Sequence, residues 1–246
     1  THTFSEPIEF STGLFIEEGA GINTVSGVVT GKPISVGGSL GRAEATGKGV
    51  AYCVNFAAKK VGMVIGESTT VVIHGFGKVG VPAAEDLAAQ GAKIIAVSDV
   101  SGAVHNPEGL DIEACSQWCK ERRFLKDITL PGTKIITNAE LLALETDILI
   151  PAAIDGVITA HNCKTIRAKI IAEGANGPLT KEAVTYLTEN GAFIIPDILC
   201  NAGGVIVSYF EWVQGLQNFF WDLDQINGKL HDILRESFDT VFACHE

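Results

Sequence analysis

Positive charge is scarce in this sequence and nowhere clustered. The 246 residues include 18 lysines and arginines against 29 aspartates and glutamates, for a formal net charge of −11. Nucleic acids and anionic membranes attract basic patches, so neither is an expected partner. No apolar run approaches the roughly 20 residues that span a bilayer, and the first residues lack the basic and apolar regions of an export signal. We expect a cytoplasmic protein without a membrane segment.

Metal-binding and disulfide patterns are also lacking. None of the six cysteines shows C-x-x-C spacing, and cysteines are too sparse for a secreted disulfide scaffold. His161 lies near Cys163, and Cys244 precedes His245, but neither pair has the second pair of ligands that a zinc site needs. We expect a reducing compartment and no metal site.

Hydrophobic residues are abundant, at 46% of the chain, and many form short runs rich in valine and isoleucine. Each run precedes a more polar, helical stretch, which is typical of a parallel sheet covered by helices. The expected strands are residues 70–74, 93–98, 147–151, 169–173 and 192–196. The expected covering helices are residues 79–90, 111–124, 138–144, 159–165 and 180–190. The pattern predicts an α/β fold, with a doubly wound, mostly parallel, Rossmann-type sheet and flanking helices.

Further helices are expected on either side of the sheet region. Residues 46–60 show a helical pattern, and two more helices are expected from Gly203 onward, with a break near residues 222–224. Aromatic residues of this last stretch are expected in the core rather than at a ligand, with some exposed where a partner domain is missing. They are Trp212, Phe219, Phe220 and Trp221. Residues 1–26 show no clear period and stay unassigned.

The run from Gly75 through Gly77 to Gly80 has the pattern G-x-G-x-x-G, between an expected strand and an expected helix. In that context it indicates dinucleotide binding, although an ordinary tight turn is the alternative. The first glycine permits a tight turn, the second lets the main chain approach a pyrophosphate, and the third lets helix and strand pack closely. We interpret residues 1–246 as one dinucleotide-binding domain, with residues 1–26 an N-terminal extension and 203–246 C-terminal helices.

Asp99 ends the next expected strand. There its carboxylate can accept hydrogen bonds from the ribose hydroxyls at the adenine end of a dinucleotide, which favours NAD over NADP. Ser98 and Ser101 would tolerate a 2′-phosphate, so NADP stays open. A solvated strand end is the structural alternative for Asp99.

Further glycine-, alanine- and asparagine-rich runs follow one another in a family-specific order. They are residues 32–49, 151–153, 172–178, 196–205 and 208–211. Together they resemble the glutamate dehydrogenase family, which includes leucine, phenylalanine and valine dehydrogenases, and the resemblance covers about residues 27–240. It implies the coenzyme-binding domain of an enzyme that reversibly deaminates an L-amino acid to its 2-oxo acid and ammonia, with hydride transfer to nicotinamide.

The resemblance also implies roles for particular residues. The coenzyme-binding positions would be Arg42, Thr46, Gly75, Phe76, Gly77, Lys78, Val79, Asp99, Ala152, Ala153, Asn176 and Asn201. In this set Thr46 would bind the nicotinamide carboxamide, residues 76–79 would lie under the pyrophosphate, and the two asparagines would lie near the nicotinamide ribose. Ser208 matches a serine that helps hold the distal carboxylate of the substrate.

Several of these residues have structural alternatives. Thr46 is a plausible helix N-cap. Asn176 and Asn201 lie beside glycines and are common types in left-handed turns, and Ser208 on an apolar helix can bond back to its own main chain. Lys78 stands where the family often has asparagine, and it would either contact a phosphate or point to solvent.

The family's catalytic lysine and aspartate and its glycine-rich lysine motif are absent, so we expect no catalytic residue in this chain. The most direct interpretation is the coenzyme-binding fragment of a glutamate dehydrogenase, inactive by itself, that meets an amino acid substrate only with the missing domain. A stand-alone NAD-binding module, or the same domain of a leucine or phenylalanine dehydrogenase, stays open. Ser208 and residues 37–42 favour an acidic substrate. The family forms homohexamers largely through the missing domain, so a monomer or weak oligomer is expected here.

Overall fold

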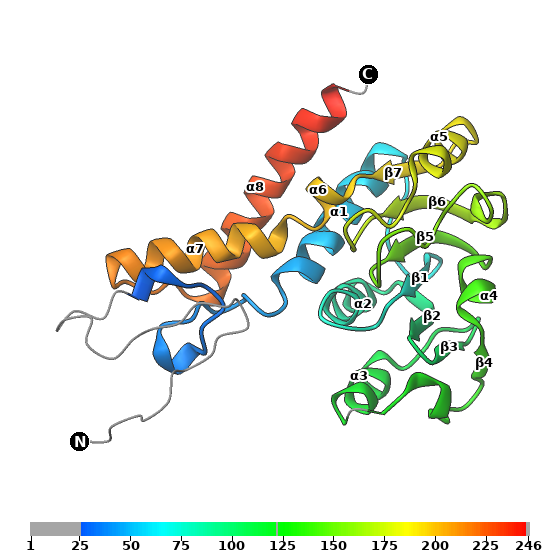
Figure 1. The fold of residues 1–246 in the computed structure, drawn as a ribbon, viewed down its shortest axis with the longest axis horizontal. Coiled ribbons are helices and arrows are strands. Elements are labelled where there is room, and N and C mark those ends of the chain that lie inside the picture. Colours follow the sequence, from blue (N-terminus) through cyan, green and yellow to red (C-terminus); the bar gives the residue numbers. More distant parts are fainter. Residues whose placement is uncertain (1–25, 122, 245–246) are drawn as a thin grey trace.

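The computed structural model describes residues 26–121 and 123–244, and a seven-stranded sheet forms the part of it on the right in Figure 1. The strands are β1 (Thr70–His74), β2 (Lys93–Asp99), β3 (Gly102–His105), β4 (Lys134–Ile136), β5 (Glu145–Pro151), β6 (Arg167–Ala172) and β7 (Phe193–Ile195). Their spatial order is β4-β3-β2-β1-β5-β6-β7. All neighbouring pairs are parallel except those of β3, which runs antiparallel to both β2 and β4. The predicted doubly wound, mostly parallel sheet is confirmed.

The strand order reverses at β1, which pairs with β2 on one side and with β5 on the other. The last residues of β1 and β5, His74 and Pro151, are register partners. At such a reversal, the loops leaving the carboxyl ends of the two strands diverge and form a crevice in which open α/β sheets bind ligands. The turn that begins at Gly75 therefore lies at the expected binding edge.

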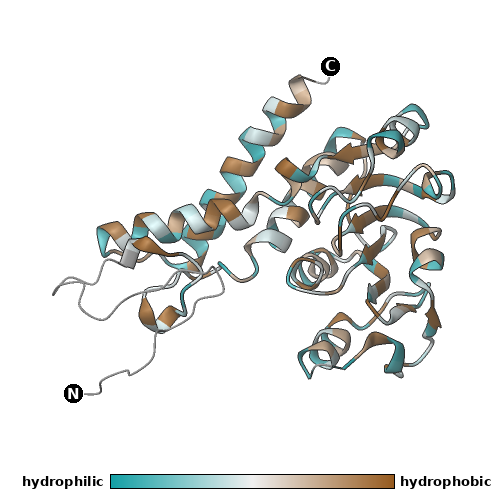
Figure 2. Cartoon of the chain, viewed as in Figure 1, coloured by the Kyte–Doolittle hydropathy of each residue, from teal (hydrophilic) through white to brown (hydrophobic). Residues whose placement is uncertain are grey.

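Helices cover both faces of the sheet. They are α1 (Ala45–Lys60), α2 (Gly80–Ala89), α3 (Ile112–Lys120), α4 (Asn138–Leu142), α5 (Lys181–Glu189), α6 (Asp197–Cys200), α7 (Gly203–Gln217) and α8 (Leu223–Ala243). Successive side chains of a strand point to opposite faces. Accordingly, Val71 and Ile73 pack with α1, α2 and α3, whereas Val72 packs with α4 and α5. Figure 2 shows the resulting concentration of hydrophobic residues along the central strands.

The predicted strands are all present, with ends that differ by at most two residues. Two short strands, β3 and β4, were not predicted. β3 has four residues and β4 three, and a strand that short carries too little alternation to be distinguished from a loop. They extend the sheet beyond β2 and lie next to the strand end that carries Asp99.

The predicted helix over residues 159–165 is wrong, because only the 3-10 turn η4 (Cys163–Thr165) forms there. The Asn162 side chain accepts from the Thr159 main-chain N–H at 2.7 Å and donates to the Val157 carbonyl at 2.8 Å. These bonds compete with those of a helix, as asparagine side chains often do. The helix expected over 111–124 also ends early, at Lys120.

The segment before α1 packs against α7, far from it in sequence (Figure 1). Lys32 and Glu211 form an ion pair at 2.7 Å, with side chains 7% and 0% exposed. The Glu211 carboxylate also accepts from the main-chain N–H groups of Gly31, at 2.7 Å, and Lys32, at 3.1 Å. This buried cluster fixes the loop that leads to Arg42.

Of the four aromatic residues singled out after Gly203, three are exposed, which are Trp212, Phe219 and Phe220. Trp221 packs on the core, edge to face with Phe210. The core expectation therefore holds for Trp221, and the expected exposure of some of these residues applies to the other three. In the part of the chain that the structure describes, no helix has both the length and the apolar character needed to cross a bilayer.

Candidate coenzyme-binding cleft

The glycine-rich turn connects β1 to α2, and its three glycines have different surroundings. Gly75 has φ +102°, and a Cβ there would lie 2.7 Å from the main chain of Ala153. A Cβ on Gly80 would overlap the Gly75 carbonyl oxygen, so this glycine permits the close approach of helix and strand. Gly77, in contrast, has no atom within 4 Å of an added Cβ. Its main chain is open to a ligand, whereas Gly75 and Gly80 are enclosed.

The exposed part of this turn leads directly into α2. Gly77 and Lys78 are exposed, and Val79 precedes the first helical residue. The first N–H groups of a helix lack partners within it, and they carry the positive end of the helix dipole. Phe76 differs, because its side chain is buried and its N–H donates to the Ser98 carbonyl at 2.6 Å. Anion binding at this turn is thus available to residues 77–80 but not to the Phe76 N–H.

A cleft of about 860 Å³ opens beside this turn, at the carboxyl ends of β1, β5 and β6. Its lining includes many of the predicted site residues, which are Arg42, Thr46, Val79, Ala152, Ala153, Asn176, Asn201 and Ser208. The residues come from five separate parts of the sequence. The fold therefore brings together most of the positions that the sequence resemblance selected, apart from those of the turn itself and Asp99.

Thr46 lies in the first turn of α1 and is not its N-cap. The helix begins at Ala45 after Glu44, whose side chain makes no capping bond. The Thr46 hydroxyl points instead at α7, since a Cβ on Gly204 would overlap it. The N-cap interpretation is therefore wrong, because the helix starts one residue earlier than expected.

Beside Thr46, the Nε atom of Arg42 is buried without a hydrogen-bond partner among the described residues. An unpaired guanidinium donor on a cleft wall suits an acceptor supplied by a ligand.

Asn176 and Asn201 meet across the cleft from different loops. Asn176 follows β6 and Asn201 follows α6, and the Asn201 amide donates to the Asn176 side-chain oxygen at 2.7 Å. Neither adopts the left-handed conformation, since Asn218 is the only non-glycine residue with positive φ among those described. The turn interpretation is therefore wrong for both, and their side chains form a polar pair on the cleft wall.

Ser208 lies one turn along α7 from Gly204. Its hydroxyl donates to the Gly204 carbonyl at 2.9 Å, as expected for a serine that bonds back to its own helix. The same side chain lines the cleft. Since a hydroxyl oxygen also accepts, the internal bond leaves its acceptor lone pairs available.

Asp99 lies outside this cleft, at the end of β2. One carboxylate oxygen accepts from the Ser101 N–H at 2.7 Å and the other from the Leu125 N–H at 2.8 Å. The Ser98 hydroxyl, in contrast, is buried and accepts from the Gly75 N–H at 3.3 Å. None of the ion pairs among the described residues involves Asp99. The end of β2 thus carries the negative charge of the Asp99 carboxylate, held in a fixed orientation by these two N–H groups.

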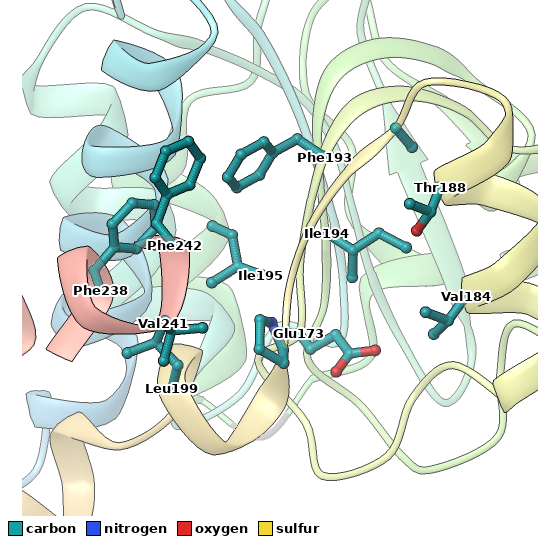
Figure 3. A pocket seen from close by; sticks show the side chains of 12 residues that line it. Glu173, Val184, Thr188, Phe193, Ile194, Ile195, Leu199, Phe238, Val241 and Phe242 are labelled. Atoms are coloured by element: carbon teal, nitrogen blue, oxygen red, sulfur yellow. The ribbon is translucent and has the colours of Figure 1, made fainter. Parts of the chain in front are cut away.

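Behind the cleft lies an apolar pocket of about 330 Å³, lined mainly by β7, α5, α6 and α8 (Figure 3). Glu173, the residue after β6, is the one carboxylate on its wall and is 6% exposed. Burial raises the pKa of Glu173 to about 7, against the lowering effect of a hydrogen bond from the Asp197 N–H. The sequence analysis assigned this residue no role, although it immediately precedes Gly174 in a run that it singled out.

Six other residues of the cleft lining had no predicted role, and they are Ile154, Asp155, Gly174, Ala175, Gly204 and Val205. Both glycines are crowded, because a Cβ on Gly174 would lie 3.1 Å from Ala152 and one on Gly204 would overlap the Thr46 hydroxyl. The adjacent pair Gly203-Gly204 at the start of a helix was the available signal, since glycine is unfavourable there without a packing reason. No three His, Cys, Asp or Glu side chains within residues 26–121 and 123–244 gather closely enough to hold a metal ion.

Comparison with known proteins identifies the family. The model of the glutamate/leucine/phenylalanine/valine dehydrogenase family matches residues 37–246. The glutamate dehydrogenase of Thermotoga maritima is 48% identical over 225 residues, which are 91% of this chain and 53% of that protein. A catabolic NAD-specific glutamate dehydrogenase of Bacillus subtilis is 44% identical over 216 residues, or 88% of this chain and 50% of that one.

Solved structures agree with the sequence matches. A hetero-hexameric glutamate dehydrogenase of Thermus thermophilus, in its leucine-bound form, superposes with a TM-score of 0.80 at 33% identity, over 88% of this chain and 50% of that one. The glutamate dehydrogenase of Peptoniphilus asaccharolyticus superposes with a TM-score of 0.73 at 35% identity, with the same coverage. The chain spans about half the length of the relatives it matches. It belongs to the glutamate, leucine, phenylalanine and valine dehydrogenase family of amino acid oxidoreductases.

Proposed function

We propose that this chain binds NAD across the glycine-rich turn and the adjoining cleft, as the coenzyme-binding part of a glutamate dehydrogenase. The observation that carries the proposal is the open main chain at Gly77, next to the N-terminus of α2 and continuous with the cleft through Val79. A pyrophosphate placed there would receive main-chain hydrogen bonds and the favourable helix dipole. The rest of the dinucleotide would extend in both directions, toward Asp99 and toward the asparagine pair.

The nicotinamide end fits the polar groups of the cleft. In the overall reaction the nicotinamide accepts a hydride from the amino acid substrate. The chain's own residues bind and orient it: the Thr46 hydroxyl would hold the carboxamide, and the Asn176–Asn201 pair would hold the ribose. Arg42 would direct its unpaired Nε at an acceptor in the same cleft. Positioning of this kind lowers the entropic part of a reaction barrier.

NAD is the preferred coenzyme in this proposal. The carboxylate of Asp99 has no cationic partner among the described residues, so a 2′-phosphate beside it would meet an uncompensated negative charge. The buried Ser98 hydroxyl faces Gly75 and is unavailable to a phosphate. The relatives from Bacillus subtilis and Staphylococcus aureus are described as NAD-specific, which supports the same choice.

Glutamate is the proposed substrate. It would bind between this chain and the half of the enzyme that the relatives have and this chain does not cover. Ser208 would contact the distal carboxylate of the substrate from the coenzyme side of the cleft. We propose that the isolated chain binds coenzyme without oxidising glutamate, because hydride transfer needs both walls of the active site.

The six free cysteines, five of them at least partly buried, are compatible with the reducing conditions of the cytoplasm. The isolated chain is proposed to be monomeric or weakly associated.

Calorimetric titration of the purified chain with NAD and with NADP tests the proposal. We expect NAD to bind about tenfold more tightly than NADP or better, given the charge at Asp99. Absence of NAD binding at about 1 mM, which corresponds to only about −4 kcal/mol, would refute coenzyme binding. A separate assay for NADH should find no turnover with glutamate, and formation of about one NADH per second, a usual enzyme rate, would contradict the inactivity of the isolated chain.

A further inference from the structure

Glu173 lies between the apolar pocket and the coenzyme-binding cleft. Its carboxyl group is on the pocket wall with Val184, Ile194 and Leu199 around it (Figure 3). The residues that follow it, from Gly174 to Asn176, line the cleft. A carboxylate in such apolar surroundings loses much of its hydration. Its ionised form then costs free energy unless hydrogen bonds or opposite charges compensate for the lost water.

The Glu173 side chain begins a chain of hydrogen bonds between two loops. One of its oxygens accepts from the Asp197 N–H at 2.8 Å, and the Asp197 carboxylate accepts from the Gly177 N–H at 2.8 Å. Asp197 begins α6, whereas Gly177 belongs to the loop after β6. The two bonds therefore tie the β7–α6 connection to the β6–α5 connection.

The polar pair of the cleft is attached to both ends of this link. Asn176 immediately precedes Gly177, and the Asn201 N–H donates to the Asp197 carbonyl at 2.9 Å. The side chains of Asn176 and Asn201 then meet at 2.7 Å. Displacement of Asp197 would move Asn201 directly and Asn176 through Gly177, so the geometry of the pair depends on where Glu173 holds Asp197.

We propose that Glu173 is a positioning residue for the coenzyme-binding cleft. Through Asp197 and Gly177 it holds the side chains of Asn176 and Asn201 in the relative position that their hydrogen bond requires. The proposal rests on the proposed binding of NAD in this cleft. The apolar side chains around Glu173 leave the residue only 6% exposed, and this limited contact with water strengthens the bond from the Asp197 N–H to its carboxylate. A hydrogen bond to an ionised acceptor is roughly twice as strong as a neutral one.

The positioning has a pH dependence whose sign follows from the surroundings of Glu173. The pKa of Glu173 is raised to about 7, first by burial and second by the nearby Asp197 charge. Cys200 of α6 is the other titratable group beside it, and its own pKa is raised far above neutrality, so it stays a neutral thiol. The α5, β7 and α8 residues of the pocket, Val184, Thr188, Phe193, Ile194, Ile195, Phe238, Val241 and Phe242, bring no charge. Glu173 therefore gains a proton as the pH falls through about 7, and the charge-assisted bond to Asp197 weakens.

The main experiment compares NAD binding by the wild-type chain, Glu173→Gln and a matched control, Glu189→Gln, from about pH 6 to about pH 8, one unit on either side of the pKa of about 7. Glu189 is an exposed residue at the end of α5, away from the cleft lining. We expect the wild type and the control to bind NAD up to about tenfold more weakly at the lower pH, the limit reached one unit below the pKa if only the ionised form of Glu173 binds well. Glu173→Gln cannot ionise and should show no such dependence.

A second measurement needs no coenzyme. The side-chain amide NMR signals of Asn176 and Asn201 should shift with a midpoint near pH 7 in the wild type and in Glu189→Gln, but not in Glu173→Gln. Signals that stay constant in the wild type, or that shift equally in Glu173→Gln, would overturn the proposal. If the wild type binds no NAD at any pH, the proposed function fails, and the NMR titration alone decides whether Glu173 positions the pair.

Discussion

Substitution of Gly77 by alanine should separate coenzyme binding from folding. An added Cβ at Gly77 meets nothing within 4 Å, and the residue does not have positive φ. The folded state should therefore accept the methyl group, and loss of chain entropy in the unfolded state should leave stability unchanged or raise it by about 0.4–1 kcal/mol. The same methyl group would occupy the space through which a pyrophosphate approaches the main chain.

The cost to binding follows from the hydrogen bonds that the methyl group would prevent. A hydrogen bond to a charged group contributes about 1.5–3 kcal/mol, so loss of one such bond weakens NAD binding about tenfold to about 150-fold. Thermal unfolding and calorimetric titration of the same samples measure both effects. The control is Gly80→Ala, whose Cβ would overlap the Gly75 carbonyl oxygen and should destabilise the fold by about 1–3 kcal/mol or more. A Gly77→Ala chain that binds NAD like the wild type would refute the placement of the pyrophosphate.

Two further predictions concern stability and thiol chemistry. Glu211→Ala removes the buried partner of Lys32 and should destabilise the fold by about 3–5 kcal/mol, which lowers the melting temperature by roughly 10 °C in a chain of this size; a decrease below about 2 °C would show that the pair contributes little. Burial raises the pKa of the Cys115 thiol to about 12, so the thiolate that reacts with disulfide reagents is almost absent at pH 8. Labelling should begin at the exposed Cys244, and mass spectrometry that finds Cys115 modified first would contradict its burial.

Local sequence signals were sufficient for the parallel part of the sheet. Residues 70–74 have the apolar run of a buried strand and end at a glycine turn, and the structure has β1 over the same residues. α5 was equally clear, since the Thr180 side chain caps it by accepting from the Ala183 N–H. In these places the local preference and the tertiary fold agree, which is the condition under which pattern analysis succeeds.

The failures have a common cause, since competing interactions are not visible in a local pattern. The helix expected over residues 159–165 is replaced by hydrogen bonds of the Asn162 side chain. The structural alternative for Thr46, a helix N-cap, fails because α1 begins at Ala45 and the Thr46 hydroxyl faces α7 instead. β3 was missed because it pairs with β2 only after the chain reverses at Gly102, whose φ is +146°.

The candidate site was predictable to a similar degree. Residues with a recognisable sequence context, such as Asn176 and Asn201, meet as the family resemblance implies, although their direct hydrogen bond was not foreseen. The contribution of Glu173 could not be inferred, because it depends on an apolar pocket built by residues up to 69 positions later in the chain, as far as Phe242. The ion pair between Lys32 and Glu211, 179 residues apart, is a similar case.

A crystal structure of the chain with NAD tests the proposed coenzyme site directly. We expect a pyrophosphate against the main chain at Gly77, the adenine ribose within hydrogen-bond distance of Asp99, and the nicotinamide in the cleft between Thr46 and Asn176. A dinucleotide bound elsewhere, or with its pyrophosphate away from Gly77, would refute this binding mode.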